Sequence, residues 1–139
     1  MEEKKQRILE LLAPFYYMAT LREGFPRMRP MGFVRLYRGR LYFGMSPRKN
    51  LYKEICADPH MEFCNTGKRG QWVRVRGIAV RETDPQAIEE LMDSLNKTLP
   101  KEPDGNQDDE FVLFWLDQCT GEIYTGDEPV PEIVDFSLS

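Results

Sequence analysis

Residues 41–50 read LYFGMSPRKN. The apolar and aromatic first half is typical of a β-strand, and we expect a helix to follow, with Ser46 as its N-cap and Pro47 in its first position. Arg48 and Lys49 then occupy the first turn, where unpaired N–H groups favour negative charge. Two cations there are unfavourable unless an anion lies between them, and a phosphate is the simplest such anion. The alternative is that both side chains extend into water.

The segments before residue 41 predict a short helix followed by strands. Residues 3–13 have the spacing of an amphipathic helix that ends at Pro14, and residues 15–21 are aromatic and β-prone. Residues 26–37 predict one long strand. Short turns separate these strands from each other and from the strand over 41–45.

The second half of the chain continues this pattern of short strands and a few helices. We expect a helix from Ser46 to about Ala57, stopped by Asp58-Pro59, and a second helix from Asp84-Pro85. Further strands are predicted over 61–65, 71–81, 110–116 and around 123–124, with a turn at 120–121, an exposed loop over 97–109 and an irregular tail from 127. The order of elements favours a mainly β fold, a small antiparallel barrel of six or seven strands with a few peripheral helices, in a single domain over residues 1–139.

Charge and composition exclude several classes of protein. The 139 residues carry a formal net charge of -4, which argues against non-specific binding of nucleic acid. Nine basic residues nevertheless lie between Arg22 and Lys53, a local patch that fits a small anionic ligand. No apolar run has the length of a membrane span or signal peptide.

The cysteines and the histidine exclude further classes. The three cysteines lack metal-ligand spacing and predict a reduced, cytoplasmic protein without a metal site. The single histidine, His60, has no obvious partner in the sequence and is expected to lie at the surface or where a strand begins. One histidine excludes multi-histidine metal sites and argues against a Ser-His-Asp triad.

Two strands place basic and aromatic side chains on one face. Alternation along residues 26–37 puts Arg27, Arg29, Met31, Phe33 and Arg35 together, a face that suits a ligand with an anionic tail and a flat apolar ring. The opposite face, with Met28, Gly32, Val34 and Leu36, is expected to face the core. The alternative is that the arginine face is a solvated barrel exterior.

The strand over 71–81 repeats this arrangement with Trp72, Arg74 and Arg76 on one face. Trp72 and Arg74 could form a surface cation–π pair or close over an aromatic cofactor. No acid–base pair, nucleophile or phosphate-binding loop stands out. An anion site with aromatic walls suggests that a cofactor performs the chemistry and the protein orients it.

Four motifs in order carry a resemblance to a known family. PRMRPMGF (26–33), LYFGMS (41–46), KNLY (49–52) and QWVRVRG (71–77) together resemble the pyridoxamine 5'-phosphate oxidase-related family, split-barrel proteins that bind FMN. The resemblance implies a homodimer with two flavins at the subunit interface. We also expect a dimer because the strands near Trp72 and Trp115 carry more large aromatics than one small barrel can bury.

The resemblance also implies which residues bind the cofactor. Arg29, Ser46 and Lys49 would hold the FMN phosphate with Arg48 and Asn50 nearby, and the segments 30–32 and 43–45 would line the isoalloxazine. The residues implied to bind FMN are Arg29, Pro30, Met31, Gly44, Met45, Ser46, Arg48, Lys49, Asn50, Trp72, Arg74 and Trp115.

The chain lacks the C-terminal Arg-x-His type of segment that the family's best-known enzyme uses to hold pyridoxal phosphate, so we do not expect it to oxidise pyridoxamine phosphate. Three hypotheses remain. The first is an FMN-dependent oxidoreductase that exchanges hydride or electrons with an unknown small molecule. The second is a non-catalytic flavin carrier or sensor, and the third is a cofactor-free relative or one that binds haem or deazaflavin. No catalytic residue is identified.

Overall fold

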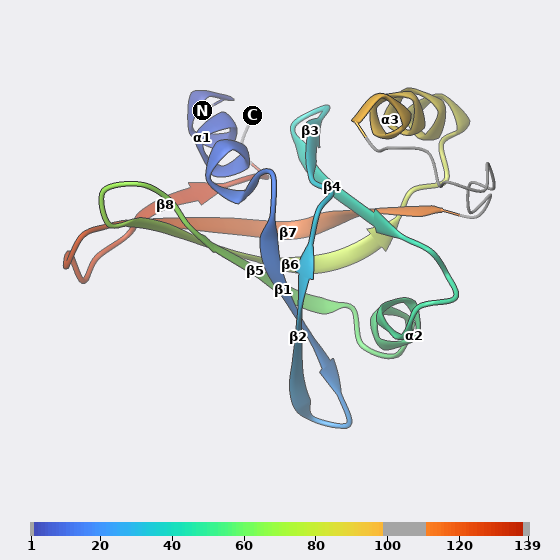
Figure 1. Ribbon diagram of the computed structural model, residues 1–139, viewed down its shortest axis with the longest axis horizontal. Coiled ribbons are helices and arrows are strands. Elements are labelled where there is room, and N and C mark those ends of the chain that lie inside the picture. The colour runs from blue at the N-terminus through green and yellow to red at the C-terminus, as the bar shows by residue number, and fades with distance from the viewer. Residues whose placement is uncertain (1, 99–110, 138–139) are drawn as a thin grey trace.

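The structure is a computed structural model that describes residues 2–98 and 111–137. It is mainly β, and its strands pair antiparallel throughout, in the order β2-β1-β5-β6-β7-β4-β3, with β8 also paired to β7. The strands are β1 (Tyr16–Arg22), β2 (Phe25–Met31), β3 (Arg35–Tyr37), β4 (Arg40–Met45), β5 (His60–Thr66), β6 (Gln71–Arg81), β7 (Val112–Thr125) and β8 (Glu132–Asp135). This sheet is strongly curved (Figure 1), which confirms the predicted mainly β, split-barrel class, although the described residues form eight strands and not six or seven.

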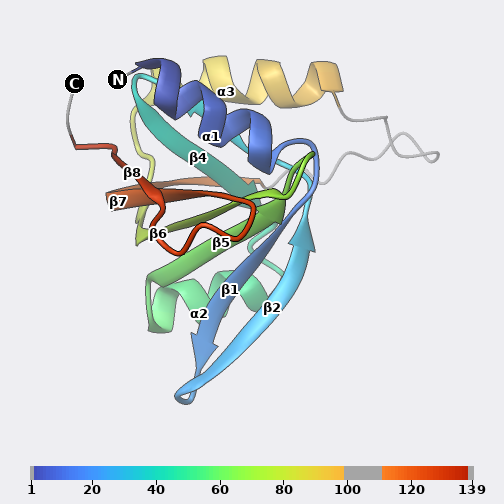
Figure 2. The same cartoon turned by 90° about the vertical axis from the view of Figure 1, so that its left-hand side faces the viewer.

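Within the described residues, three helices lie around the sheet. They are α1 (Glu2–Leu12), α2 (Asn50–Ala57) and α3 (Pro85–Thr98). The two views show α1 and α3 above the sheet and α2 below it, beside the β1–β2 hairpin, which extends away from the body (Figures 1 and 2). None of the described helices is long and apolar enough to cross a membrane.

The single long strand predicted over residues 26–37 is wrong. The chain forms β2, leaves the sheet at residues 32–34 and re-enters it as β3 at the opposite edge. Pro30 has no N–H to donate to a neighbouring strand, and Gly32 has no side chain to pack on the sheet. Neither residue therefore favours a strand that continues through 32–34. The break also changes the faces, because Phe33 and Val34 are both buried while Met28, which we expected in the core, is 67% exposed.

The C-terminal part is more regular than predicted. Residues 112–125 form one continuous strand, β7, and the predicted turn at 120–121 lies inside it, paired with Val75 and Arg76 of β6. The tail, expected to be irregular, contains β8. The loop predicted over 97–109 lies almost wholly outside the described residues.

Two apolar clusters hold these elements together. The larger fills the barrel and includes Ile8 of α1, Leu51 and Ile55 of α2, and Phe63 of β5. The smaller lies between α3 and the sheet and contains Phe33, Tyr42, Leu91, Leu95 and Leu113. Helix α2 is therefore fixed to the barrel by the apolar stripe that its sequence predicts.

Candidate functional site

The segment that joins β4 to α2 forms a turn and not the first turn of a helix. Helix α2 begins at Asn50 with Lys49 as its N-cap, so the prediction that Ser46 caps the helix and Pro47 starts it is wrong. The Ser46 side-chain oxygen instead accepts the Arg48 backbone N–H at 3.3 Å, and its carbonyl accepts that of Lys49 at 3.2 Å. Ser46 lies three residues before the N-cap position, so its hydroxyl does not reach the free N–H groups of α2.

This turn presents cations at a helix start without a counter-charge. Arg48, Lys49 and Asn50 are exposed, the Lys49 side chain makes no capping hydrogen bond, and the first turn of α2 contains no acidic residue. Within residues 2–98 and 111–137, neither Arg48 nor Lys49 forms a salt bridge. Positive side chains beside free helix N–H groups are a chemically suitable place for a phosphate.

Arg29 lies against α2 but is already engaged. Its Nη2 group donates to Glu54 Oε1 and to Thr20 Oγ1, each at 2.9 Å, and burial lowers the pKa of Arg29 although Glu54 opposes that shift. Sequence reasoning missed Glu54, which is buried. The signal was present, because Glu54 follows Leu51 by three residues and precedes Ile55 and so lies on the core stripe of α2.

The residues expected to line a flavin ring are packed to different degrees. Met45 is buried in the larger core and Met31 packs against its edge, while Pro30 is exposed and pairs with Tyr17. Gly44 has no free space, because a Cβ there would lie 2.4 Å from the Phe111 ring. A ligand outside the barrel therefore meets neither the Met45 side chain nor the side of Gly44 that Phe111 covers.

Trp72, Tyr124 and Arg74 form a half-buried platform on the outer face of the sheet, in which the two rings are stacked. The Trp72 ring lies 4.1 Å from Tyr124 with the planes at 9°, and Arg74 Cζ lies 5.3 Å from the Trp72 ring. Arg74 donates to the Tyr124 hydroxyl at 2.8 Å and contacts Glu62 and Glu122. The hydrogen bond with Tyr124 is the main cause of a raised pKa for Arg74.

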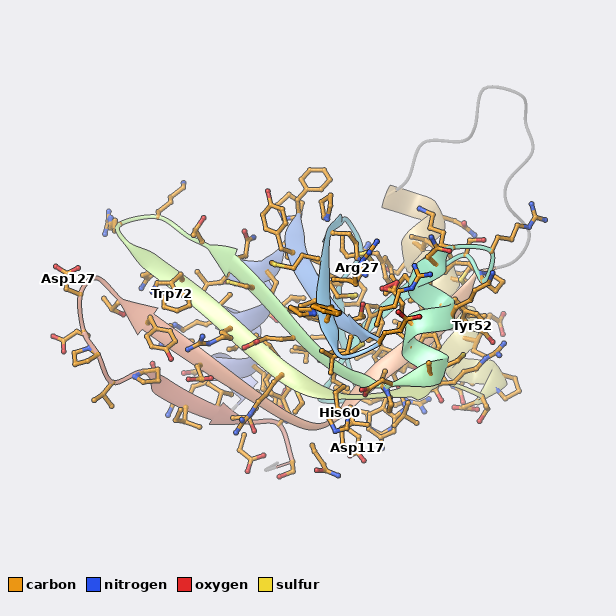
Figure 3. The ribbon with its side chains drawn as sticks, turned by 90° about the horizontal axis from the view of Figure 1, so that it is seen from below. Arg27, Tyr52, His60, Trp72, Asp117 and Asp127 are labelled. Atoms are coloured by element: carbon orange, nitrogen blue, oxygen red, sulfur yellow. The ribbon has the colours of Figure 1, made fainter. Side chains whose placement is uncertain are left out.

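The platform and the cationic turn lie at opposite ends of the sheet. Trp72 pairs with Tyr124 near the end of β7, whereas Met45, just before the turn, pairs with Val112 at its start. Twelve residues of strand separate these positions, roughly 40 Å if fully extended. Figure 3 shows the same separation between Trp72 and Tyr52 of α2. One chain therefore does not bring the two groups together.

Trp115 belongs to a third location. It packs at the edge of the smaller apolar cluster, and Arg40 Cζ lies 3.8 Å from its ring. The Ser46–Asn50 turn instead follows Met45, which faces the larger core. The structure does not bring Trp115 to the turn or to the Trp72 platform.

A cleft of about 950 Å³ crosses the outer face of β1, β5, β6 and β7. Its lining includes Glu62, Arg74, Arg76 and Asp117, together with His60. Contrary to expectation, His60 has a partner, because its Nδ1 lies 2.8 Å from Asp58 Oδ1, and this contact lowers the pKa of Asp58. His60 and Asp117 lie on the two strands that flank Ile78 of β6, and each pairs with that residue (Figure 3).

The described residues contain no cluster of side chains that could hold a metal ion. Cys56, Cys64 and Cys119 are all free thiols, and burial raises the pKa of Cys119 to about 12. The buried Cys119 is therefore protonated and unreactive at neutral pH.

Comparison with known proteins identifies the family. The model of the family described as pyridoxamine 5'-phosphate oxidase matches residues 1–120, and the chain belongs to this family, as the resemblance predicts. A search of curated proteins returns no match.

Solved structures share the fold. A NimC/NimA family protein from Clostridium acetobutylicum is 25% identical with a TM-score of 0.73, and the alignment covers 94% of this chain and 90% of that protein. A pyridoxamine 5'-phosphate oxidase-related, FMN binding protein from Nostoc punctiforme is 16% identical with a TM-score of 0.63, covering 95% and 86%. A heme binding protein from Mycobacterium smegmatis is 13% identical with a TM-score of 0.69, covering 99% of this chain and 59% of that one.

Proposed function

We propose that this chain is an FMN-binding flavoprotein that works as a homodimer and passes hydride or electrons through the flavin. The observation that carries this proposal is the turn Ser46–Asn50, with exposed Arg48 and Lys49 at the uncapped start of α2. Membership of the family supports it, as does the similarity in fold to a protein described as FMN binding.

The turn fits the phosphate end of FMN. Lys49 and Arg48 supply positive charge, and the first backbone N–H groups of α2 supply further donors. The flavin ring would lie along the backbone of residues 30–31 and 44–45. FMN supplies the redox chemistry when bound, and these residues bind and orient it, which is the main requirement for hydride transfer at flavin N5.

A second copy of the chain completes the site in this proposal. The Trp72 platform lies too far along β7 to reach a flavin held at the turn of its own chain. A dimer in which one chain provides the turn and the other provides Trp72 and Arg74 would use both ends of the sheet. Such an arrangement would also cover exposed apolar side chains of the hairpin, including Phe25 and Met28.

The absorption spectrum of the purified protein, with the mass of any bound molecule, tests the cofactor. Flavin bands and the mass of FMN support the proposal. A Soret band or the mass of a deazaflavin would overturn it. So would a protein that is mixed with FMN and retains no flavin once the unbound FMN is removed. Stopped-flow mixing with NADH or NADPH then distinguishes an oxidoreductase, whose flavin is reduced, from a flavin carrier or sensor, whose flavin is not.

A further inference from the structure

A compact polar bridge joins the β1–β2 hairpin to helix α2. Thr20 Oγ1 donates to Glu54 Oε1 at 3.0 Å, and Arg29 Nη2 donates to both oxygens at 2.9 Å. Arg29 Nη1 adds a longer contact of 3.4 Å to the Met18 carbonyl. Thr20 and Glu54 are 2% and 6% exposed, so the bridge lies where an unpaired charge would be costly.

The bridge uses the part of Arg29 that would grip a phosphate. A guanidinium holds an oxyanion with two parallel N–H groups, either from both terminal nitrogens or from Nε and the neighbouring terminal nitrogen. Nη2, which takes part in such pairs, already directs its two protons at Thr20 and Glu54. Arg29 is thus positioned as an internal partner of Glu54, with its charge largely neutralised.

We propose that Arg29 serves the phosphate site by neutralising the buried carboxylate of Glu54, while Arg48 and Lys49 supply the charge that binds the phosphate. This inference rests on the phosphate binding of the proposed function. Glu54 lies four residues after Asn50, about 6 Å along the helix axis. At this distance the Glu54 charge, if not balanced by Arg29, would weaken phosphate binding at the turn.

Charge removal from either side of the bridge tests this role. Arg29→Gln leaves Glu54 uncompensated and should weaken binding of FMN and of inorganic phosphate about three- to tenfold. Glu54→Gln should tighten both by a similar factor, although it lowers the melting temperature without ligand. The double variant removes a neutral pair and should stay within about threefold of the parent. Riboflavin, which lacks the phosphate, should bind all variants alike.

Thr20→Val is the matched control, because it removes one bridge group and leaves both charges. It should lower the melting temperature without changing the ratio of FMN to riboflavin affinity. FMN and riboflavin binding are measured by flavin fluorescence, and inorganic phosphate binding is measured by the shift in melting temperature.

Three results would overturn the inference. In the first, the double variant loses as much phosphate affinity as Arg29→Gln, which would make Arg29 a direct ligand. In the second, Glu54→Gln weakens phosphate binding in step with the loss of stability, as a merely structural residue would. In the third, the parent binds no phosphate. If the single variants do not fold, the double variant decides, because it leaves no unpaired charge. If the parent binds phosphate but not FMN, the proposed function is wrong, and the phosphate affinities of the variants alone then test the inference about Arg29 and Glu54.

Discussion

Trp72 lies flat against Tyr124, with the ring centroids 4.1 Å apart and the planes at 9°. Tyr124 is close to the end of β7, and the start of the same strand carries Val112 opposite Met45. Lys49 follows Met45 by four residues, so Lys49 and the Trp72 platform mark opposite ends of one sheet. In the proposed dimer, a ligand that contacts both would lie between two chains.

Complementation between two defective variants follows from this geometry. Lys49→Ala and Trp72→Ala homodimers should each bind FMN poorly, because each lacks one end of both sites. A heterodimer of the two variants, isolated with a different tag on each chain, contains one intact site and should bind about one FMN. Fluorescence titration gives the stoichiometry. A heterodimer that binds as poorly as both homodimers would place Lys49 and Trp72 in the same site of one chain.

The phosphate role of Lys49 predicts a difference between two flavins. A charge-assisted contact contributes roughly 1.5–3 kcal/mol, so Lys49→Ala should weaken FMN binding between about tenfold and over a hundredfold. Riboflavin binding should change little. Lys68→Ala removes the same charge from the exposed β5–β6 turn and serves as the control. Equal losses for FMN and riboflavin would show that Lys49 acts on the ring or on the fold.

The sequence predicted the elements well where local patterns determine them. The bounds of β6 are those predicted, and Leu51 and Ile55 face the core as their helical spacing indicates. The predicted start of α2 was misplaced because a Ser-Pro pair also suits a turn. Only the backbone structure shows that Ser46 lies in a turn and not at a helix N-cap. The polar bridge could not be predicted in full, since Thr20, Arg29 and Glu54 meet only through tertiary packing of α2 on β1.

Gly44 should tolerate no side chain, for a reason of packing. A Cβ at this position would lie 2.4 Å from the Phe111 ring and 2.8 Å from the Val112 carbonyl oxygen. Gly44→Ala should therefore destabilise the fold by about 1–3 kcal/mol in denaturant unfolding. Gly32→Ala, whose Cβ would meet Phe15 at an ordinary 3.5 Å, is the control and should change stability much less. Equal effects would mean that the Phe111 ring and the Val112 carbonyl both move aside freely.

The buried Tyr42 hydroxyl predicts a loss of stability at alkaline pH. It donates to Glu82 Oε1 at 2.5 Å, and burial, aided by this hydrogen bond, raises the pKa of Tyr42 to about 12. An unfolded tyrosine titrates near 10. The folded state thus keeps the proton longer, and this contribution to stability is complete below pH 10 and declines as the pH rises from about 10 to about 12.

Tyr42→Phe should show both parts of this effect in urea unfolding at pH 8, 10 and 11. At pH 8 it should cost about 1–3 kcal/mol, because the hydrogen bond to Glu82 is lost. Above pH 10 its stability should fall less steeply than that of the parent, because one titrating group is gone. The slope does not vanish, since burial also raises the pKa values of Tyr16 and Cys119. Tyr17→Phe, which removes an exposed hydroxyl, should follow the parent. A Tyr42→Phe curve parallel to the parent's across this range would show that Tyr42 ionises alike in the folded and unfolded states.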